Sequence, residues 1–283
     1  MTYIEGRDLF RSQLKVFFEI NEIDFYYKMI LKFFFKIEPT TLALEPKTLF
    51  LPAKLKIIKA VLKRLLNEEP LQYILGTTSF RSLELQVTPA VLIPRPETEE
   101  LVEWILEDYK SIEHKHVVID IGTGSGCIAI SLAKDQPFFN VSALDISSKA
   151  LEIAKSNAIE NKTVINFLQA DITVLSSEIF PIDVIVSNPP YIHPREKKEM
   201  KNNVLNNEPH IALFVPEEDP LLFYRRILEY AQKNLLPDGV VYFEINPYFL
   251  TEMKNLIFSI TNYSIEERKD KFGKVRMLRL QSH

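Results

Sequence analysis

Scarce cysteine, scarce glycine and a small net charge limit what this 283-residue chain can do. The single cysteine excludes a disulfide framework and a Cys-x-x-Cys metal site, and the five histidines lack the spacing of a metal-binding motif. A net charge of −4 gives no overall attraction for nucleic acid. There is no long uncharged apolar run to span a membrane, and the N-terminus lacks the apolar core of a secretory signal. We therefore expect a cytoplasmic protein without a metal.

Glycine is rare but clustered. The chain has 7 glycines, where average usage of about 7% would give roughly 20. Three of the seven fall within five residues, at Gly122, Gly124 and Gly126. They follow an apolar segment that is typical of a strand and precede a helical segment. In an open α/β sheet, glycines at the end of a strand let the backbone approach a ligand closely.

The first part of the chain has the pattern of a helical bundle. Apolar residues recur at helical spacing over 7–20, and Lys28, Lys32 and Lys36 lie four apart. We expect these lysines to form one solvated face of a core-packing helix rather than of a membrane-surface helix. Pro52 is expected to begin a third helix. Residues 1–70 are thus predicted to form a helical bundle, and 71–96, with an alternating pattern and three prolines, a hairpin linker.

From residue 97 onward, apolar strands alternate with helices. We expect strands at 117–120, 140–144, 164–168, 183–186 and 240–245, and helices at 127–134, 147–161, 220–234 and 251–259. Two more strands, at 263–269 and 274–280, flank a turn. This order predicts an α/β domain over 97–283, with a mostly parallel, helix-covered sheet and a C-terminal antiparallel hairpin.

Aspartates close three of the expected strands, at Asp120, Asp145 and Asp171. The glycine spacing is Gly-x-Gly-x-Gly, whereas a dinucleotide fingerprint needs Gly-x-Gly-x-x-Gly and a P-loop needs a Lys-Ser/Thr pair. Acids beside glycines suit S-adenosylmethionine (SAM), a cationic nucleoside without phosphate, better than a pyrophosphate; a dehydrogenase-like nucleotide site is the alternative. Cys127, in the first turn of the next helix, is expected to pack as a small residue rather than to act as a reactive thiol.

Asn188, Pro189, Pro190 and Tyr191 follow the strand at 183–186. The two prolines fix the backbone and remove two donors, so that the turn presents carbonyl oxygens. With the Asn188 oxygen and a flat aromatic ring, the turn can hold a planar –NH2 group. Because an amide nitrogen is a poor nucleophile, holding both of its hydrogens would direct its lone pair at a methyl group. This pattern predicts methyl transfer to a planar amine, whereas a rigid loop without function is the simpler alternative.

Longer segments carry a family resemblance. They are Glu-Pro-Leu-Gln-Tyr-Ile-Leu-Gly at 69–76, Val-Leu-Ile-Pro-Arg-Pro-Glu-Thr-Glu at 91–99, Asp-Ile-Gly-Thr-Gly-Ser-Gly-Cys-Ile-Ala at 120–129 and Asn-Pro-Pro-Tyr-Ile at 188–192. With them the chain resembles the protein-(glutamine-N5) methyltransferases of peptide-chain release factors, the HemK/PrmC family, over nearly its whole length. The Arg-Pro-Glu-Thr-Glu segment distinguishes this family from DNA amino-methyltransferases that share the Asn/Asp-Pro-Pro-Tyr element.

The resemblance implies a SAM-dependent, Rossmann-like domain preceded by a helical domain that helps to dock the substrate. It implies that SAM, released as S-adenosylhomocysteine, is bound by Gly122, Thr123, Gly124, Ser125, Gly126, Asp145, Asp171, Ile172 and Asn188. The substrate glutamine would be held, and its methylation catalysed, by Asn188, Pro189, Pro190 and Tyr191. The segment 95–98 would lie over the cofactor.

The implied reaction is methyl transfer to the glutamine of the Gly-Gly-Gln motif in class I release factors. We expect a monomer that makes no direct contact with nucleic acid. An amino-methyltransferase acting on a nucleic acid base and a methyltransferase-like protein without activity stay open as rivals. The chain departs from the family in two loops: Glu-Ile-Asn-Pro at 244–247 replaces Glu-Ile-Gly, and Glu-Glu-Asp-Pro-Leu at 217–221 replaces Gly-x-Asp-Gly-Leu. His193, which opens a polar stretch at 193–207, is not expected to act as a base.

Overall fold

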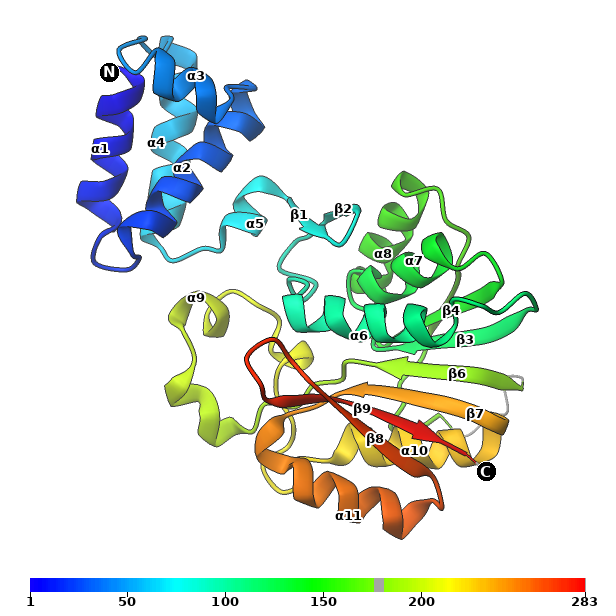
Figure 1. The fold of residues 1–283 in the computed structure, drawn as a ribbon. Coiled ribbons are helices and arrows are strands. Elements are labelled where there is room, and N and C mark those ends of the chain that lie inside the picture. Colours follow the sequence, from blue (N-terminus) through cyan, green and yellow to red (C-terminus); the bar gives the residue numbers. More distant parts are fainter. Residues whose placement is uncertain (176–180, 283) are drawn as a thin grey trace. The chain divides into compact units, whose positions relative to one another are not determined.

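The chain folds into two compact units. The computed structural model describes residues 1–175 and 181–282, and Figure 1 names their helices and strands. The first unit comprises Met1–Gly76 and Lys201–Asn207, and the second comprises Thr77–Met200 and Glu208–His283. The division at 1–70, 71–96 and 97–283 inferred from sequence stays a prediction about the separate roles of these parts.

The first unit is helical. Its helices are α1 (Tyr3–Leu14), α2 (Ile20–Phe35), α3 (Pro39–Leu44), α4 (Pro52–Leu66), α5 (Leu71–Leu75) and α9 (Asn202–Leu205). The predicted start of a helix at Pro52 is confirmed, and Lys28, Lys32 and Lys36 are all exposed. Helix α9 comes from far along the chain, and the nearby Asn207 side chain donates a hydrogen bond to the Glu68 carbonyl at 3.2 Å.

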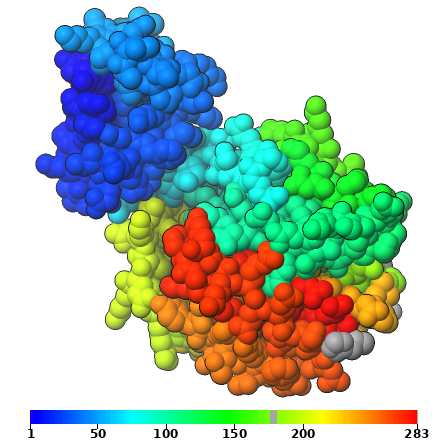
Figure 2. All heavy atoms as spheres, viewed as in Figure 1, coloured from blue at the N-terminus to red at the C-terminus, as the bar shows by residue number. Residues whose placement is uncertain are grey.

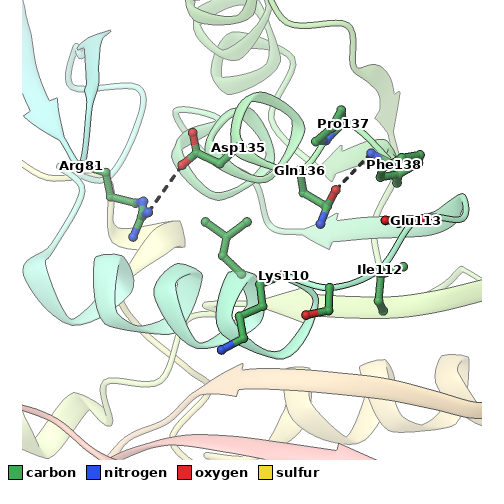
Figure 3. Close-up of a pocket in the computed structure, with 10 residues that line it drawn as sticks. Arg81, Lys110, Ile112, Glu113, Asp135, Gln136, Pro137 and Phe138 are labelled. Carbon is green, nitrogen blue, oxygen red and sulfur yellow. Dashed lines mark hydrogen bonds and ion pairs between the residues drawn. The ribbon is translucent and has the colours of Figure 1, made fainter.

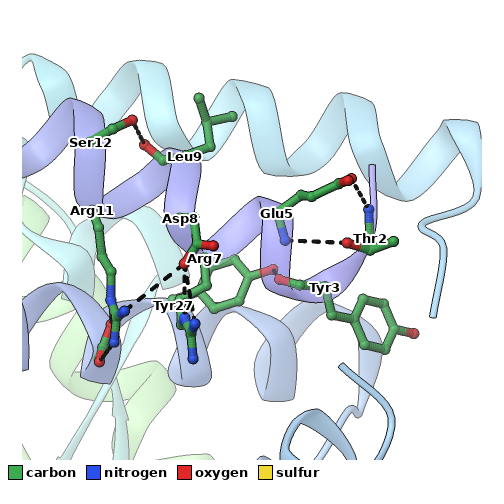
Figure 4. Close-up of polar contacts among 10 residues, drawn as sticks. Thr2, Tyr3, Glu5, Arg7, Asp8, Leu9, Arg11, Ser12 and Tyr27 are labelled. Carbon is green, nitrogen blue, oxygen red and sulfur yellow. Dashed lines mark hydrogen bonds and ion pairs between the residues drawn. The ribbon is translucent and has the colours of Figure 1, made fainter. Parts of the chain in front are cut away.

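The helix expected over 7–20 is shorter and starts earlier. A capping box between Thr2 and Glu5 begins α1 at Tyr3, as Figure 4 shows. The helix ends at Leu14, because the chain turns there to bring α2 alongside, and Arg11 forms an ion pair with Asp24 of α2 at 2.5 Å. Apolar residues continue through this turn, so periodicity alone did not mark the end of the helix.

The second unit contains a sheet that, within the described residues, has seven strands in the order β5-β4-β3-β6-β7-β9-β8. Its strands are β3 (His116–Ile121), β4 (Phe139–Asp145), β5 (Asn166–Gln169), β6 (Ile182–Ser187), β7 (Leu235–Glu244), β8 (Ser264–Lys269) and β9 (Val275–Gln281). The pairs among β3 to β7 are parallel, and β9 is antiparallel to both of its neighbours. This confirms the predicted mostly parallel sheet with a C-terminal antiparallel hairpin.

Of two smaller expectations, the structure confirms one and corrects the other. The hairpin expected before residue 97 is present as β1 (Thr77–Phe80) and β2 (Leu83–Gln86). Strand β7 begins at Leu235, five residues before the expected start at 240. The expected start was wrong because Pro237 and Gly239 look like a turn, whereas the chain passes them in an irregular pairing with β6.

Helices cover both faces of the sheet (Figure 1). Successive strand residues point to opposite faces, so Val118 packs with α6 (Pro96–Asp108), α7 (Cys127–Asp135) and α8 (Ser148–Glu160). Ile119 packs on the other face with α10 (Leu222–Asn234) and α11 (Leu250–Ile260). Because both faces are buried, the central strands are nearly continuous apolar runs, the feature that made them recognisable in the sequence.

The C-terminal strands close the sheet at one edge. Strand β8 is the outermost strand of the sheet at this edge, and all of its residues are exposed or half-buried. Figure 2 shows this red and orange part of the chain at the surface of the second unit. In the described part of the chain, no helix is both long enough and apolar enough to cross a lipid bilayer.

We predict that Gly126→Ala destabilises the protein more than Gly273→Ala. Both glycines have φ of +83°, so each alanine should cost about 1–2 kcal/mol in backbone strain. A Cβ at Gly126 would also lie 2.9 Å from Ile130 Cδ1 and 3.2 Å from Ala154 Cβ, whereas nothing lies within 4 Å at Gly273. Overpacking should add about 1–3 kcal/mol at Gly126. Urea unfolding measures both losses, and equal losses would contradict the close packing of α7 on α8.

Candidate active site at the carboxyl ends of the strands

The candidate site lies where the strand order reverses. Strand β3 pairs with β4 on one side and with β6 on the other, and such a point opens a crevice at the carboxyl ends of the strands. The Ser187 hydroxyl, at the end of β6, donates a hydrogen bond to the Ile121 carbonyl at 2.6 Å. This bond fixes the ends of β3 and β6 side by side, so the glycine segment and the Asn-Pro-Pro-Tyr turn leave the sheet together.

A cavity of about 260 Å³ lies at this edge of the sheet. Its walls include predicted site residues from four strand ends, namely Gly122, Gly124, Asp145, Asp171, Ile172, Asn188, Pro189 and Pro190. Apolar side chains complete it, among them Leu144, Ile146, Ile211 and Ile227. Predicted site residues that are up to 68 positions apart in the sequence, from Gly122 to Pro190, thus share one concave surface.

Asp145 connects the glycine segment to the next strand. Its two carboxylate oxygens accept hydrogen bonds from the backbone N–H groups of Gly124 and Ser147, each at 2.9 Å. Burial raises the pKa of Asp145, and these backbone donors oppose the shift. The carboxylate therefore holds the loop in place while it faces the cavity.

Four predicted site residues do not line the cavity: Thr123, Ser125, Gly126 and Tyr191. Thr123 points into the protein and donates a hydrogen bond to Asp120 at 2.6 Å. The Ser125 carbonyl accepts a hydrogen bond from Asn157, and Gly126 packs against α8. These three residues shape the loop from behind, while Gly122 and Gly124 face the cavity.

Tyr191 is held at both ends. Its hydroxyl donates a hydrogen bond to Glu244 Oε1 at 3.1 Å, and its carbonyl accepts one from Asn246 Nδ2 at 3.1 Å. The Asn246 side chain also caps the short helix η3 (Pro247–Phe249) by accepting from the Tyr248 N–H. Asn246 stands where the family pattern has glycine, and its φ of −77° requires no glycine.

Glu208, which motif spacing alone did not single out as a site residue, joins two walls of the cavity. Its buried carboxylate accepts hydrogen bonds from the Arg95 side chain at 2.6 Å and from the Ile93 N–H at 3.2 Å. Ile93 follows the wall residues at 90–92, and Glu208 precedes the wall residues at 211–212. The only sequence signal was an acid in the Glu-Pro pair at 208–209, because the Arg95 partner lies 113 positions away.

Cys127 and His193 are not reactive groups of this cavity. Burial raises the pKa of the Cys127 thiol to about 12, which excludes the low-pKa thiol considered from the sequence. His193 is buried away from the cavity: its Nδ1 accepts from the Arg195 N–H at 3.2 Å, and its Nε2 lies 3.1 Å from the Glu217 carbonyl. Both ring nitrogens therefore have backbone hydrogen-bond partners outside the cavity.

A second, wider hollow of about 580 Å³ lies near the amino ends of β3 and β4 (Figure 3). It is lined by the segments 110–113 and 135–138 and by Arg81, which forms an ion pair with Asp135 at 3.4 Å. No motif residue lies there, and ligands in such sheets bind at the opposite edge. The smaller cavity, with its converging polar groups, is the candidate active site.

Two family descriptions match the chain. "PrmC N-terminal domain" matches residues 10–76, and "Methyltransferase small domain" matches residues 98–213. The release factor glutamine methyltransferase of Flavobacterium psychrophilum is 44% identical over 276 residues, 97% of this chain and 97% of that protein. The release factor glutamine methyltransferase of Bacteroides thetaiotaomicron is 45% identical over 226 residues, 80% of each chain.

Solved structures show the same fold. A methyltransferase of Pyrococcus furiosus has a TM-score of 0.51 at 20% identity, over 79% of this chain and 98% of that one. A 16S rRNA methyltransferase of Thermus thermophilus, in complex with AdoMet and guanosine, has a TM-score of 0.55 at 17% identity, over 73% of this chain and 50% of that one. At these identities the likeness concerns the fold alone.

Asp120 lies buried behind the glycine segment, and its charge should limit stability at high pH. Its Oδ2 accepts hydrogen bonds from Thr123 and from the Ala129 N–H, whereas its Oδ1 has no partner within the described residues. Burial raises the pKa of Asp120 to about 7, against the opposing effect of these hydrogen bonds. Between pH 4 and 7 the folded protein therefore keeps a proton that the unfolded chain has lost.

We predict that the unfolding free energy of the wild type falls relative to that of Asp120→Asn as the pH rises from 5 to 7. The unfolding free energy of Asp120→Asn minus that of the wild type should increase by about 1.4 kcal/mol per pH unit and level off above pH 7, where the folded carboxyl is also ionised. A pH-independent cost of the asparagine does not affect the slope of this difference against pH. Urea unfolding of the ligand-free proteins at pH 5, 6, 7 and 8 measures it, and a difference independent of pH would contradict the assignment.

Proposed function

Because the chain belongs to the family of release factor glutamine methyltransferases, we propose that it transfers a methyl group from SAM to a release factor. The acceptor is the side-chain amide nitrogen of the glutamine in the Gly-Gly-Gln motif of class I release factors. One observation carries the proposal: Gly122 and Gly124 line the same cavity as Asn188, Pro189 and Pro190. A cofactor loop and an amide-binding turn thus share one surface.

The cavity residues fit this cofactor. A Cβ at Gly122 or Gly124 would occupy open space at the wall, so the glycines leave room that any other residue would fill. Asp145 and Asp171 supply carboxylates for ribose hydroxyl and ammonium donors. Leu144, Ile146 and Ile172 offer apolar contact for a base. These residues hold the cofactor; when bound, SAM supplies a methyl group on a sulfonium centre.

The turn after β6 acts on the substrate amide. The Asn188 side-chain oxygen and the Pro189 carbonyl accept the two amide hydrogens, which orients the nitrogen lone pair and stabilises the positive charge that develops on nitrogen. The methylated nitrogen is acidic enough to give its extra proton to solvent water, so no strong base is needed. The position of His193, buried away from the cavity, is consistent with this. Tyr191, off the cavity wall, keeps the turn in position through its contacts with Glu244 and Asn246.

Mass spectrometry of a release factor incubated with SAM and this protein tests the proposal. We expect a gain of one methyl group on the glutamine of the Gly-Gly-Gln motif. A release factor with glutamate in that position is the control and should gain none. Parallel incubations with DNA and with RNA address the rival substrate, because methylation of a nucleic acid base and not of the release factor would overturn the proposal.

Two substitutions should separate the substrate half of the site from the cofactor half. Asn188→Ala should lower kcat about 100-fold, since a preorganised hydrogen-bond partner of the reacting amide is lost, and should leave the Kd for SAM nearly unchanged. Asp145→Ala should raise the Kd for SAM about 10-fold or more, because a carboxylate acceptor is removed. Calorimetry gives Kd and the methylation assay gives kcat. Full turnover by Asn188→Ala, or unchanged SAM affinity of Asp145→Ala, would refute the respective role.

A further inference from the structure

A chain of hydrogen bonds connects the amide-binding turn to a buried acid. Asn188 Nδ2 donates to Thr98 Oγ1 at 3.1 Å, and Thr98 Oγ1 donates to Glu244 Oε2 at 2.7 Å. The other Glu244 oxygen, Oε1, accepts from the Tyr191 hydroxyl. The three elements involved, α6, β7 and the turn after β6, meet here although Thr98 and Glu244 lie 146 positions apart.

This chain is shielded from water. Thr98 is 2% exposed and Glu244 is 1% exposed, so neither side chain can exchange its partner for solvent. Burial, with a smaller contribution from Glu97, raises the pKa of Glu244, and the hydrogen bonds from Thr98 and Tyr191 and the nearby charge of Arg276 oppose this rise without cancelling it. Both carboxylate oxygens receive a hydroxyl proton, the arrangement of an ionised carboxylate that has no proton to give.

The direction of the chain follows from counting protons. A threonine hydroxyl has one hydrogen, and Thr98 gives it to Glu244. Thr98 Oγ1 can then only accept from its other neighbour, so Asn188 must present its –NH2 group to Thr98. Because the side-chain amide is planar, its oxygen lies on the opposite side from that contact. The orientation of an asparagine amide is otherwise ambiguous, and here the donor–acceptor pattern decides it.

We propose that Glu244, acting through Thr98, is a positioning residue that fixes the Asn188 amide with its oxygen directed to the substrate. The inference rests on the proposed function, in which that oxygen accepts a hydrogen from the substrate amide. A flipped Asn188 would present its –NH2 group to the substrate –NH2, and two donors would face each other. Glu244 and Thr98 thus determine which end of the Asn188 amide faces the cavity, although neither residue lines the cavity.

The paired variants Thr98→Val and Thr98→Ser test the proposal. Valine keeps the size and shape of threonine but has no hydroxyl, whereas serine keeps the hydroxyl and loses only the methyl group. We expect Thr98→Val to lower kcat about 10- to 100-fold, with KM for the release factor and Kd for SAM within about threefold of the wild type. Thr98→Ser should recover kcat to within about threefold of the wild type. Thermal unfolding checks that both variants are folded.

The outcomes separate this inference from the proposed function. If the wild type transfers no methyl group to the release factor, the proposed function fails. If the wild type is active and Thr98→Val keeps its kcat, the positioning role fails alone. Equal losses in Thr98→Val and Thr98→Ser would also overturn it, because Thr98 would then act by packing rather than through its hydroxyl.

Glu244→Gln gives an independent measurement should Thr98→Val not fold. The glutamine amide has one acceptor oxygen where the carboxylate had two. If its –NH2 group faces Tyr191, the Tyr191 hydroxyl loses its acceptor. If its –NH2 group faces Thr98, the Thr98 hydroxyl turns its proton toward Asn188 and reverses the Asn188 amide. We expect a lower kcat with SAM binding retained, and an unchanged kcat would overturn the proposal. Where Thr98→Val does fold, the double variant Glu244→Gln/Thr98→Val should lose less than the product of the two single losses, since both act on one chain of contacts. Independent, fully multiplicative losses would overturn the proposal.

Discussion

The parallel pairing of β3 with β6 is the constraint on which the site depends. It places Asp120 opposite Val186, and the hydrogen bond from Ser187 to the Ile121 carbonyl closes the two strand ends against each other. The chain leaves β3 through the glycine segment and leaves β6 through the Asn-Pro-Pro-Tyr turn. The two motifs therefore meet because of the sheet register, and a slip in this pairing would separate them although each motif would remain intact.

Local signals carried most of what the sequence could predict. The strand, glycine segment and helix over 117–134 are consecutive, so their order and their place at a sheet edge follow from short-range patterns. The parallel sheet was equally readable, since strands buried on both faces must be apolar throughout. Periodicity failed where burial continues through a turn, as after Leu14, or where a turn-like Pro-Asp-Gly lies inside a strand, as in β7.

The sequence could not predict which side chains from distant segments form hydrogen bonds with one another. An acid after an apolar run marks Glu244 as a strand end, but nothing in the residues near it identifies Thr98 and Tyr191 as its donors. Glu208 presents the same difficulty, with its partner Arg95 on a distant segment. Asn246 is a different case, because the sequence marks it as a departure from the family's glycine. Only the structure shows that this asparagine supports Tyr191, by donating a hydrogen bond to the Tyr191 carbonyl.

The chemistry explains why the buried contacts are arranged as they are. Methylation of an amide nitrogen needs a correctly oriented lone pair more than it needs a strong base, so the substrate half of the site must control donor and acceptor direction. A surface asparagine can turn over freely, whereas one whose –NH2 group is tied to a buried hydroxyl and carboxylate cannot. In the proposed function the cofactor half has no such demand, because open space at Gly122 and Gly124 and the carboxylates at the ends of β4 and β5 suffice there. The proposed substrate half therefore depends on buried hydrogen bonds between side chains that only the fold brings together, whereas the proposed cofactor half depends on open space and acids at neighbouring strand ends.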